Sequence, residues 1–180
     1  MAASLGALSE EGALLGLSWA DAIGARAEGE TRFLGVAGAW RLAEGVTLSG
    51  EAEFGRGDLS GWMRTSAPVQ TSAYAAALSF DLAPGALVTL SARQPLRVDG
   101  GAFVVSLPTA DARGRASLAF TDRAIALTPS GRALELGVAL DLWRADEFSL
   151  RASLTHADEP GHIASAPDET TAQLGARVQF

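Results

Sequence analysis

The sequence predicts an all-β fold of antiparallel strands. Three observations support it: a period of two in the placement of apolar residues, connections that alternate between short and long, and a polar face made of small and ionisable side chains. Successive side chains of a strand point to opposite sides, so a sheet with two different faces requires this alternation. An amphipathic helix would instead place apolar residues three and four positions apart. We expect about ten strands in a single domain covering residues 1–180.

The clearest alternation lies at the C-terminal end of the chain. Leu174, Ala176, Val178 and Phe180 share one predicted face there, and mostly polar residues share the other. The same period recurs in the segments 46–54, 74–82, 134–142 and 148–154. Less regular strands are expected at 15–19, 34–42, 87–93, 101–107 and 115–127. We expect residues 1–11 to be a frayed strand or a helical lead-in.

The connections are predicted to alternate between the two ends of the sheet. Tight turns are expected at 43–45, 83–85 and 143–147, and long polar links at 55–70 and 157–170. Shorter links are expected at 95–100, 108–114 and 128–131. Counting strands back from Phe180 places all three tight turns at one end and both long links at the other. Barrels of bacterial outer membranes have short turns on one side and longer loops on the other, and the sequence fits that pattern.

The distribution of charge favours a membrane barrel over a soluble sandwich. Lys is absent, and the formal net charge of −7 argues against nucleic acid as a partner. The predicted apolar face is nearly free of charge, as a lipid-facing surface requires. The opposite face carries ionisable residues that suit a barrel lumen: Arg41, Glu51, Glu53, Asp141, Arg151 and Arg177. We therefore expect an antiparallel up-and-down β-barrel of outer-membrane type, because closure pairs the backbone groups that hydrocarbon cannot satisfy.

The last strand looks like the C-terminal signal that the barrel-insertion machinery of Gram-negative bacteria reads. It ends in Phe180, with Val178, Ala176 and Leu174 on the same face. The expected partners are therefore the lipid bilayer and that machinery, and the expected location is the cell outer membrane. No segment resembles a secretory signal, so an exported chain is expected to carry its signal upstream.

No catalytic residue, cofactor site or metal site is expected. His156 and His162 lie in or beside a predicted polar loop that also contains Asp158, Glu159 and Asp168, and a solvated acidic loop is favoured over a metal site. Glu51 and Glu53 lie about 7 Å apart on one strand face, where an acid/base pair is conceivable. Arginines of the lumen, placed opposite, favour ion pairs instead. The absence of Cys removes thiol chemistry.

Three motifs, taken in order, resemble a known protein family. They are Gln94-Pro95-Leu96, Pro129-Ser130-Gly131-Arg132 and Pro160-Gly161-His162. Their order and spacing resemble the autotransporter-like C-terminal region of exported subtilisin-like (S8 family) serine peptidases of alphaproteobacteria. The resemblance covers roughly the last 150 residues. It implies a barrel of twelve strands when complete, which anchors or translocates an N-terminal protease passenger. The peptidase domain is missing from this sequence, so no catalytic residue is carried over.

Two other functions remain open at this point. One is a soluble β-sheet accessory or binding domain of a secreted S8 protease, which predicts a monomer that needs no detergent. The other is a small porin-like or adhesin-like barrel without a passenger, which the coding sequence upstream would distinguish from an anchored protease. An enzyme in its own right is the least favoured of the alternatives.

Overall fold

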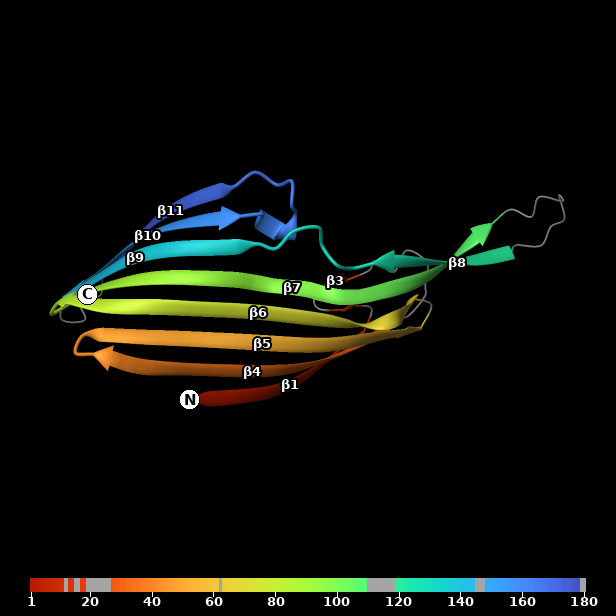
Figure 1. Ribbon diagram of the computed structural model, residues 1–180, viewed down its shortest axis with the longest axis horizontal. Coiled ribbons are helices and arrows are strands. Elements are labelled where there is room, and N and C mark those ends of the chain that lie inside the picture. The colour runs from red at the N-terminus through yellow and green to blue at the C-terminus, as the bar shows by residue number, and fades with distance from the viewer. Residues whose placement is uncertain are drawn as a thin grey trace.

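A computed structural model of the chain shows one large antiparallel sheet (Figure 1). The structure describes residues 1–11, 13–14, 17–18, 27–61, 63–109, 119–144 and 148–178. Nine strands form the large sheet, and two short strands form a separate hairpin. The strands are β1 (Ala2–Glu11), β2 (Ala13–Leu14), β3 (Leu17–Ser18), β4 (Ala27–Ala43), β5 (Val46–Gly61), β6 (Met63–Ala83), β7 (Ala86–Thr109), β8 (Ala119–Ala126), β9 (Leu134–Arg144), β10 (Phe148–Asp158) and β11 (Glu169–Val178). A short 3₁₀ turn, η1, covers Pro160–His162.

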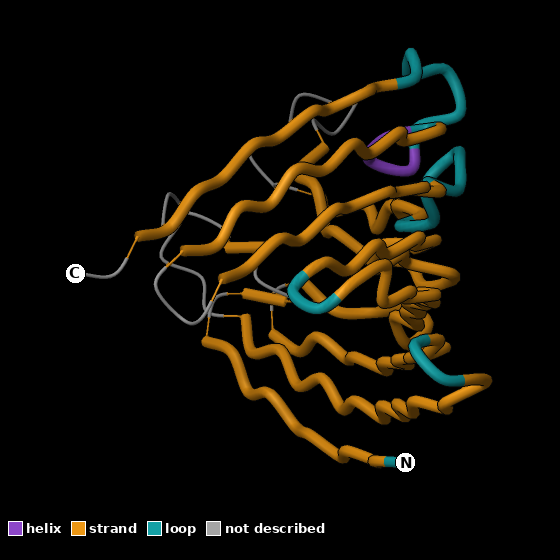
Figure 2. Tube along the Cα trace, turned by 90° about the vertical axis from the view of Figure 1, so that its left-hand side faces the viewer, coloured by secondary structure: helices purple, strands orange, loops and turns teal. Residues whose placement is uncertain are grey.

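The large sheet is open, so the predicted closure into a barrel is not observed. Its strand order is β1-β4-β5-β6-β7-β9-β10-β11, with β8 paired to β7, and every neighbouring pair is antiparallel. Figure 2 shows the sheet curling into a trough with its two edge strands at opposite margins. Closure would require hydrogen bonds between β1 and β11, and the pairing of the described residues contains none. The all-β antiparallel class is confirmed, and the N-terminal residues form a strand rather than a helical lead-in.

The chain does not reverse at two of the predicted turns, 95–100 and 128–131, and the course of β7 explains both. This strand is continuous through 95–100, where a reversal was expected, and its two halves have different partners. Residues 86–93, next to the tight turn between β6 and β7, pair with β9, and residues 102–109 pair with β8. Consequently β8 and β9 lie end to end along one side of β7, and residues 127–133 link them without an end turn. The link predicted at 55–70 is also wrong, because β5 and β6 run through most of that segment.

Irregular pairing between β6 and β7 accommodates the residues that suggested turns. Four register shifts lie within residues 65–74 of β6, opposite residues 94–103 of β7. Pro68 and Pro95 have no backbone N–H to donate, so each is tolerated where the ladder is already interrupted. Gly101 has a φ of 128°, and a Cβ there would lie 2.8 Å from the Cα of Val69. These residues bend and shift the two strands instead of reversing them.

The tight turns at 43–45 and 83–85 are confirmed. Glu44-Gly45 joins β4 to β5 and Pro84-Gly85 joins β6 to β7, and both glycines adopt positive φ values of 70° and 83°. Residues 145–147 of the third predicted turn lie outside the described residues. The two described turns lie at the same end of the sheet (left in Figure 1). The prediction places both turns at one end although it contains two reversals too many. The chain does not reverse at 95–100, because β7 is continuous, or at 128–131, because β8 lies in line with β9. Removing two reversals leaves the remaining turns at the same end.

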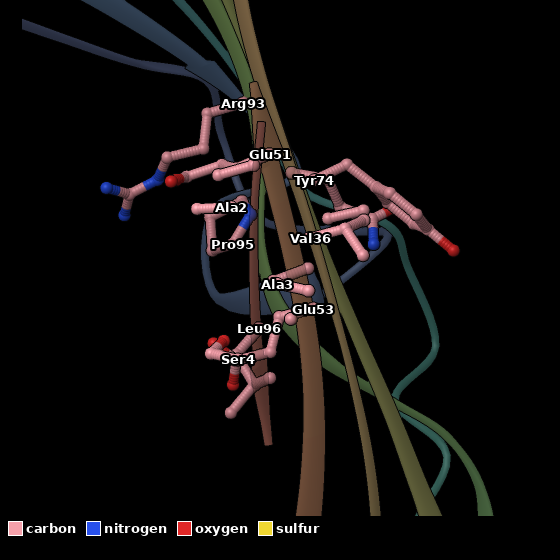
Figure 3. Close-up of a pocket in the computed structure, with 15 residues that line it drawn as sticks. Ala2, Ala3, Ser4, Val36, Glu51, Glu53, Tyr74, Arg93, Pro95 and Leu96 are labelled. Carbon is pink, nitrogen blue, oxygen red and sulfur yellow. The ribbon is translucent and has the colours of Figure 1, made fainter. Parts of the chain in front are cut away.

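The two faces of the sheet differ in both shape and chemistry. Figure 3 shows Glu51 and Arg93 directed to one side of the strands, and Val36 and Tyr74 directed to the other. On the side of Glu51, residues from β1, β4, β5, β6, β7, β9 and β10 line a single cavity of about 730 Å³. Seven neighbouring strands can line one cavity only where the sheet curves around it, so this is the concave face. The side of Val36 and Tyr74 is the convex face.

Few apolar side chains are buried. Among the described residues, the buried apolar side chains are Val69, Phe103, Ala133 and Ala139. Val69 and Phe103 lie in the irregular zone of β6 and β7, so the best-packed part of the molecule is away from the tight turns. The remaining large apolar side chains of the described residues are partly or fully exposed.

Candidate functional site

An uninterrupted apolar surface covers most of the convex face. We call it the apolar band, and it consists of the even-numbered residues of 34–42, 46–54, 74–82, 86–92, 134–142, 148–154 and 172–178. Cross-strand register places these residues side by side, as in the row Trp40, Leu48, Leu78, Leu90, Val138 and Leu154. None of them is charged, and their only polar side-chain atoms belong to Trp40 and Tyr74.

The apolar band is exposed to a degree that water disfavours. Trp40 is 45% exposed, Val138 41% and Leu174 76%. Burying apolar surface is worth about 25 cal/mol per Å², and soluble monomers rarely leave a contiguous patch larger than a few hundred Å² uncovered. A band that extends over seven strands therefore requires a cover, either lipid or another protein surface.

Charged and polar residues border the apolar band on the side away from the tight turns. We call this row the polar border; it comprises Glu30, Arg32, Arg56, Asp58, Ser72, Arg97, Asp99, Arg132, His156 and Asp158. Arg32 contacts Glu30 at 2.8 Å, and Arg97 contacts Asp99 at 2.7 Å. Just inside the border, the rings of Phe54 and Tyr74 meet edge to face, with their centroids 5.6 Å apart. Aromatic rings at an apolar–polar boundary are typical of membrane interfaces.

The polar border crosses the strands obliquely. On β4 the band ends at Leu34, whose row continues through Phe54 to Ser72. On β10 it ends at Leu154, whose row leads back through β9 and β7 to Leu78. Ser72 and Leu78 are six residues apart on β6, a distance of about 20 Å, and the five strand spacings from β4 to β10 add about 24 Å. The band is thus inclined to the perpendicular of the strands by about 40° on these spacings.

The three motifs that carry the family resemblance come together beside the irregular part of β7. We call this arrangement the motif network. The guanidinium of Arg132 donates to the side-chain oxygen of Gln94 and, at 3.4 Å, to Asp99. Arg97 Nε donates to the carbonyl of Gly131 at 3.0 Å, and the backbone N–H of Arg132 donates to Glu159 at 2.6 Å. Hydrogen bonds that involve a charged group are stronger than those between neutral groups. They hold the β8–β9 link to β7, and the segment around η1 to that link.

His162 lies at the centre of the motif network and bridges β7 and the link between β8 and β9. Its Nδ1 accepts the backbone N–H of Ala133 at 2.9 Å, and its Nε2 lies 3.0 Å from the carbonyl oxygen of Leu96. A carbonyl only accepts, so Nε2 carries the proton and the imidazole is neutral in this arrangement. The side chain is buried and its backbone has a φ of 61°, unusual for a residue with a Cβ. The pairing of β7 with β9 ends at Arg93 and Glu135, and beyond this point the imidazole connects the backbone of Leu96 to that of Ala133.

Asp99 is the ionised centre of the same network. It accepts a hydrogen bond from Ser72 of β6 and from Arg97, and it lies close to Arg132. Partial burial opposes its ionisation, but the hydrogen bonds and the two arginine charges outweigh burial and lower the pKa of this carboxyl. The carboxylate therefore stays charged at neutral pH and ties β6, β7 and the β8–β9 link together.

The predicted lumen charges lie at concave-face positions of their strands. Arg151 lies 3.7 Å from Asp141, its direct cross-strand neighbour, and not beside Glu51 or Glu53. The ion pair between Arg93 and Glu135, at 3.3 Å, was not anticipated. Its two residues border the same cavity as Glu51. The pairing of residue 93 with residue 135 follows from the strand register across β7 and β9, and no local sequence signal identifies it.

The remaining predicted residues are placed as follows. Leu174, Ala176 and Val178 lie on the convex side of β11, and Phe180 lies outside the described residues. His156 contacts the Thr170 hydroxyl at 3.0 Å. The described part of the chain contains no group of three or more His, Asp or Glu side chains placed to share a metal ion. Nor does it contain a helix that is long and apolar enough to cross a bilayer.

We compared the chain with models of protein families, with curated proteins and with solved structures, and found no match in any of the three. The resemblance of the three motifs to the C-terminal regions of S8 peptidases therefore stays a prediction.

Proposed function

We propose that the chain is the β-barrel of an outer-membrane anchor, which holds or translocates an N-terminal subtilisin-like protease passenger and performs no catalysis of its own. The convex face meets lipid, and the concave face lines an aqueous lumen. The observation that carries the proposal is the apolar band, which extends over seven strands without a charge. In lipid this surface is covered by acyl chains, whereas in water it would have to be covered by a protein.

The dimensions of the apolar band support this proposal. The nine residues Leu34–Leu42 extend about 26 Å along their strand, and an inclination of about 40° reduces this to about 20 Å of bilayer thickness. The outward apolar band of outer-membrane barrels is about 25 Å tall, and their strands are tilted by about 35–45°. Between β4 and β10 the edge of the band shifts by six residues, as the tilt of the strands in a membrane barrel would require.

Closure of the barrel is part of the proposal. In hydrocarbon, the unpaired backbone groups of β1 and β11 would each cost several kcal/mol. The main path of the sheet contains eight strands, each antiparallel to the next, so its two edge strands run in opposite directions. They can therefore pair antiparallel with each other, or with an even number of further strands, as a barrel of twelve implies.

The motif network supports the proposed relation to S8 peptidases, from which the protease passenger is inferred. Three motifs separated by about 30 residues each resemble S8 peptidase C-terminal regions, and their side chains form one set of hydrogen bonds. Because the three motifs contact one another in the fold, we expect them to occur together in related sequences. The passenger itself is inferred from the resemblance alone.

The test uses the absence of Cys from the sequence. Leu90→Cys places a single thiol on the convex face of β7. Ser91→Cys, at the adjacent position, places a single thiol on the concave face. After reconstitution into vesicles, we expect a lipid-soluble thiol reagent to label Leu90→Cys and a charged reagent to label only Ser91→Cys. The folded chain should also change its mobility on an SDS gel after boiling. A chain that remains monomeric in detergent-free buffer, with Leu90→Cys open to the charged reagent, would instead identify a soluble accessory domain.

A further inference from the structure

Two arginines of the polar border face each other directly. Arg32 of β4 and Arg56 of β5 are cross-strand partners in the first row beyond Leu34 and Phe54. Like charges opposite each other in a sheet destabilise it, so this pair has a cost unless an anion lies between the two side chains. The side chain of Arg32 is 76% exposed, which leaves it accessible to such an anion.

Within the described residues, only one of the two guanidinium groups has an ion-pair partner. Glu30 contacts Arg32 at 2.8 Å, whereas Arg56 has no ion pair with any described residue. The next row outward is the acidic pair Glu30 and Asp58. The chain neighbours of the two arginines, Thr31 and Gly57, are buried on the opposite face, so the strand pleat directs both arginine side chains to the convex face. The convex face therefore changes from apolar to basic to acidic over three successive rows.

We propose that Arg32 and Arg56 bind the phosphate of an anionic lipid whose acyl chains lie over Leu34 and Phe54. This site rests on the proposed function, since it requires the apolar band to face a bilayer. Guanidinium groups match phosphate oxygens with paired N–H donors, and one phosphate between them relieves the repulsion of the two charges. Their long stems can lie on apolar surface while the charged ends reach the headgroup layer.

The other arginine pair of the border does not serve this purpose. Arg97 and Arg132 direct their guanidinium groups to Asp99, Gln94 and the carbonyl of Gly131. Those donors are occupied within the motif network, and the carboxylate already balances part of the charge. The geometry therefore selects Arg32 and Arg56 as the lipid site.

The experiment measures which lipids remain bound to the folded chain. The full chain is reconstituted in phosphatidylcholine containing a minority of phosphatidylglycerol with the same acyl chains, and retained lipids are counted by native mass spectrometry. Each basic residue near an anionic surface contributes about fivefold in affinity, so we expect phosphatidylglycerol to be enriched by roughly five- to thirtyfold over the bulk mixture. Arg32→Gln with Arg56→Gln should abolish the enrichment. The control, Arg41→Gln with Arg151→Gln, removes two charges from the concave face and should retain it.

The possible outcomes separate the two proposals. Equal enrichment in the Arg32→Gln, Arg56→Gln variant would overturn the lipid site while leaving the membrane anchor intact. Inorganic phosphate that displaces phosphatidylglycerol at millimolar concentration would assign the arginines to a soluble anion and overturn the lipid source. If Leu90→Cys shows that the chain does not insert at all, the anchor fails and this site fails with it.

Discussion

Towards the tight turns, the sheet consists of regular ladders bearing Ala, Gly, Leu and Val on the convex face. At the other end, the motif network joins three segments through individual charged and polar atoms. The ladders need only the right class of side chain at each position, because any uncharged apolar residue leaves the surface apolar. The network depends on particular atoms, since His162 and Arg132 each satisfy partners that no neighbour replaces. The two regions should therefore respond to opposite kinds of substitution.

The largest expected effect is that of a charge placed in the apolar band. Leu90→Arg, near the middle of the band, should destabilise the folded chain in vesicles by about 2–4 kcal/mol, whereas Leu134→Arg at the polar border should cost at most about 1 kcal/mol. Urea unfolding in lipid vesicles measures the difference. Equal costs at both positions would mean that the band does not lie across a bilayer.

Substitution of a glycine in the motif network should have the next largest effect. A Cβ on Gly131 would lie 2.6 Å from the backbone nitrogen of Ala164 and 2.9 Å from the carbonyl carbon of Ile163. Gly131→Ala should therefore displace the segment after η1, at a cost of about 1–3 kcal/mol. Limited proteolysis at residues 159–166 reports the displacement. Gly175→Ala is the control, because a Cβ there meets nothing within 4 Å.

Removal of the imidazole bridge tests the network at a single side chain. His162→Phe leaves the carbonyl of Leu96 and the N–H of Ala133 without their partner, which costs about 1–2 kcal/mol. We expect the Ala133 amide to exchange its hydrogen roughly tenfold faster, as measured by hydrogen–deuterium exchange. His156→Phe, an exposed histidine on β10, should leave that exchange rate unchanged. An unaltered rate in His162→Phe would show that the bridge contributes nothing.

The smallest expected effect concerns Asp99 and pH. The pKa of Asp99 is lowered in the fold, so its ionised form contributes stability above the unfolded pKa of about 3.9 and loses it as pH falls through the folded value. Asp99→Asn should cost about 1 kcal/mol at pH 7 and progressively less below about pH 4. Urea midpoints of both proteins across this range measure the effect. A gap that stays constant down to about pH 2 would contradict an ionic role.

The strands are predictable from the sequence because alternation is a local property. Residues 134–142 and 148–154 alternate without interruption, and both lie within strands of the sheet. Pro95 and Gly100 predict a turn at 95–100, because the same residues suit both a reversal and an irregular pair of strands. The Gly and charged residues of 55–61 predict a loop, although this segment continues β5 and brings Arg56 to the polar border.

Relations between distant strands were beyond the reach of the sequence. The three motifs could be recognised one by one, but their contact depends on β8 and β9 lying in line along β7. The ion pair of Arg93 and Glu135 depends on the same alignment. The openness of the sheet depends on how curvature accumulates across all its strands, and no single segment encodes it.

The tandem arrangement of β8 and β9 along β7 also has a kinetic consequence. Residues 102–109 of β7 meet residues 119–126, a short distance along the chain, whereas residues 86–93 must wait for residues 135–142. Closing a short loop loses less chain entropy, so the hairpin of β7 and β8 can form first. Once formed, it fixes which part of β7 is still free, and β9 then has a single register in which to join.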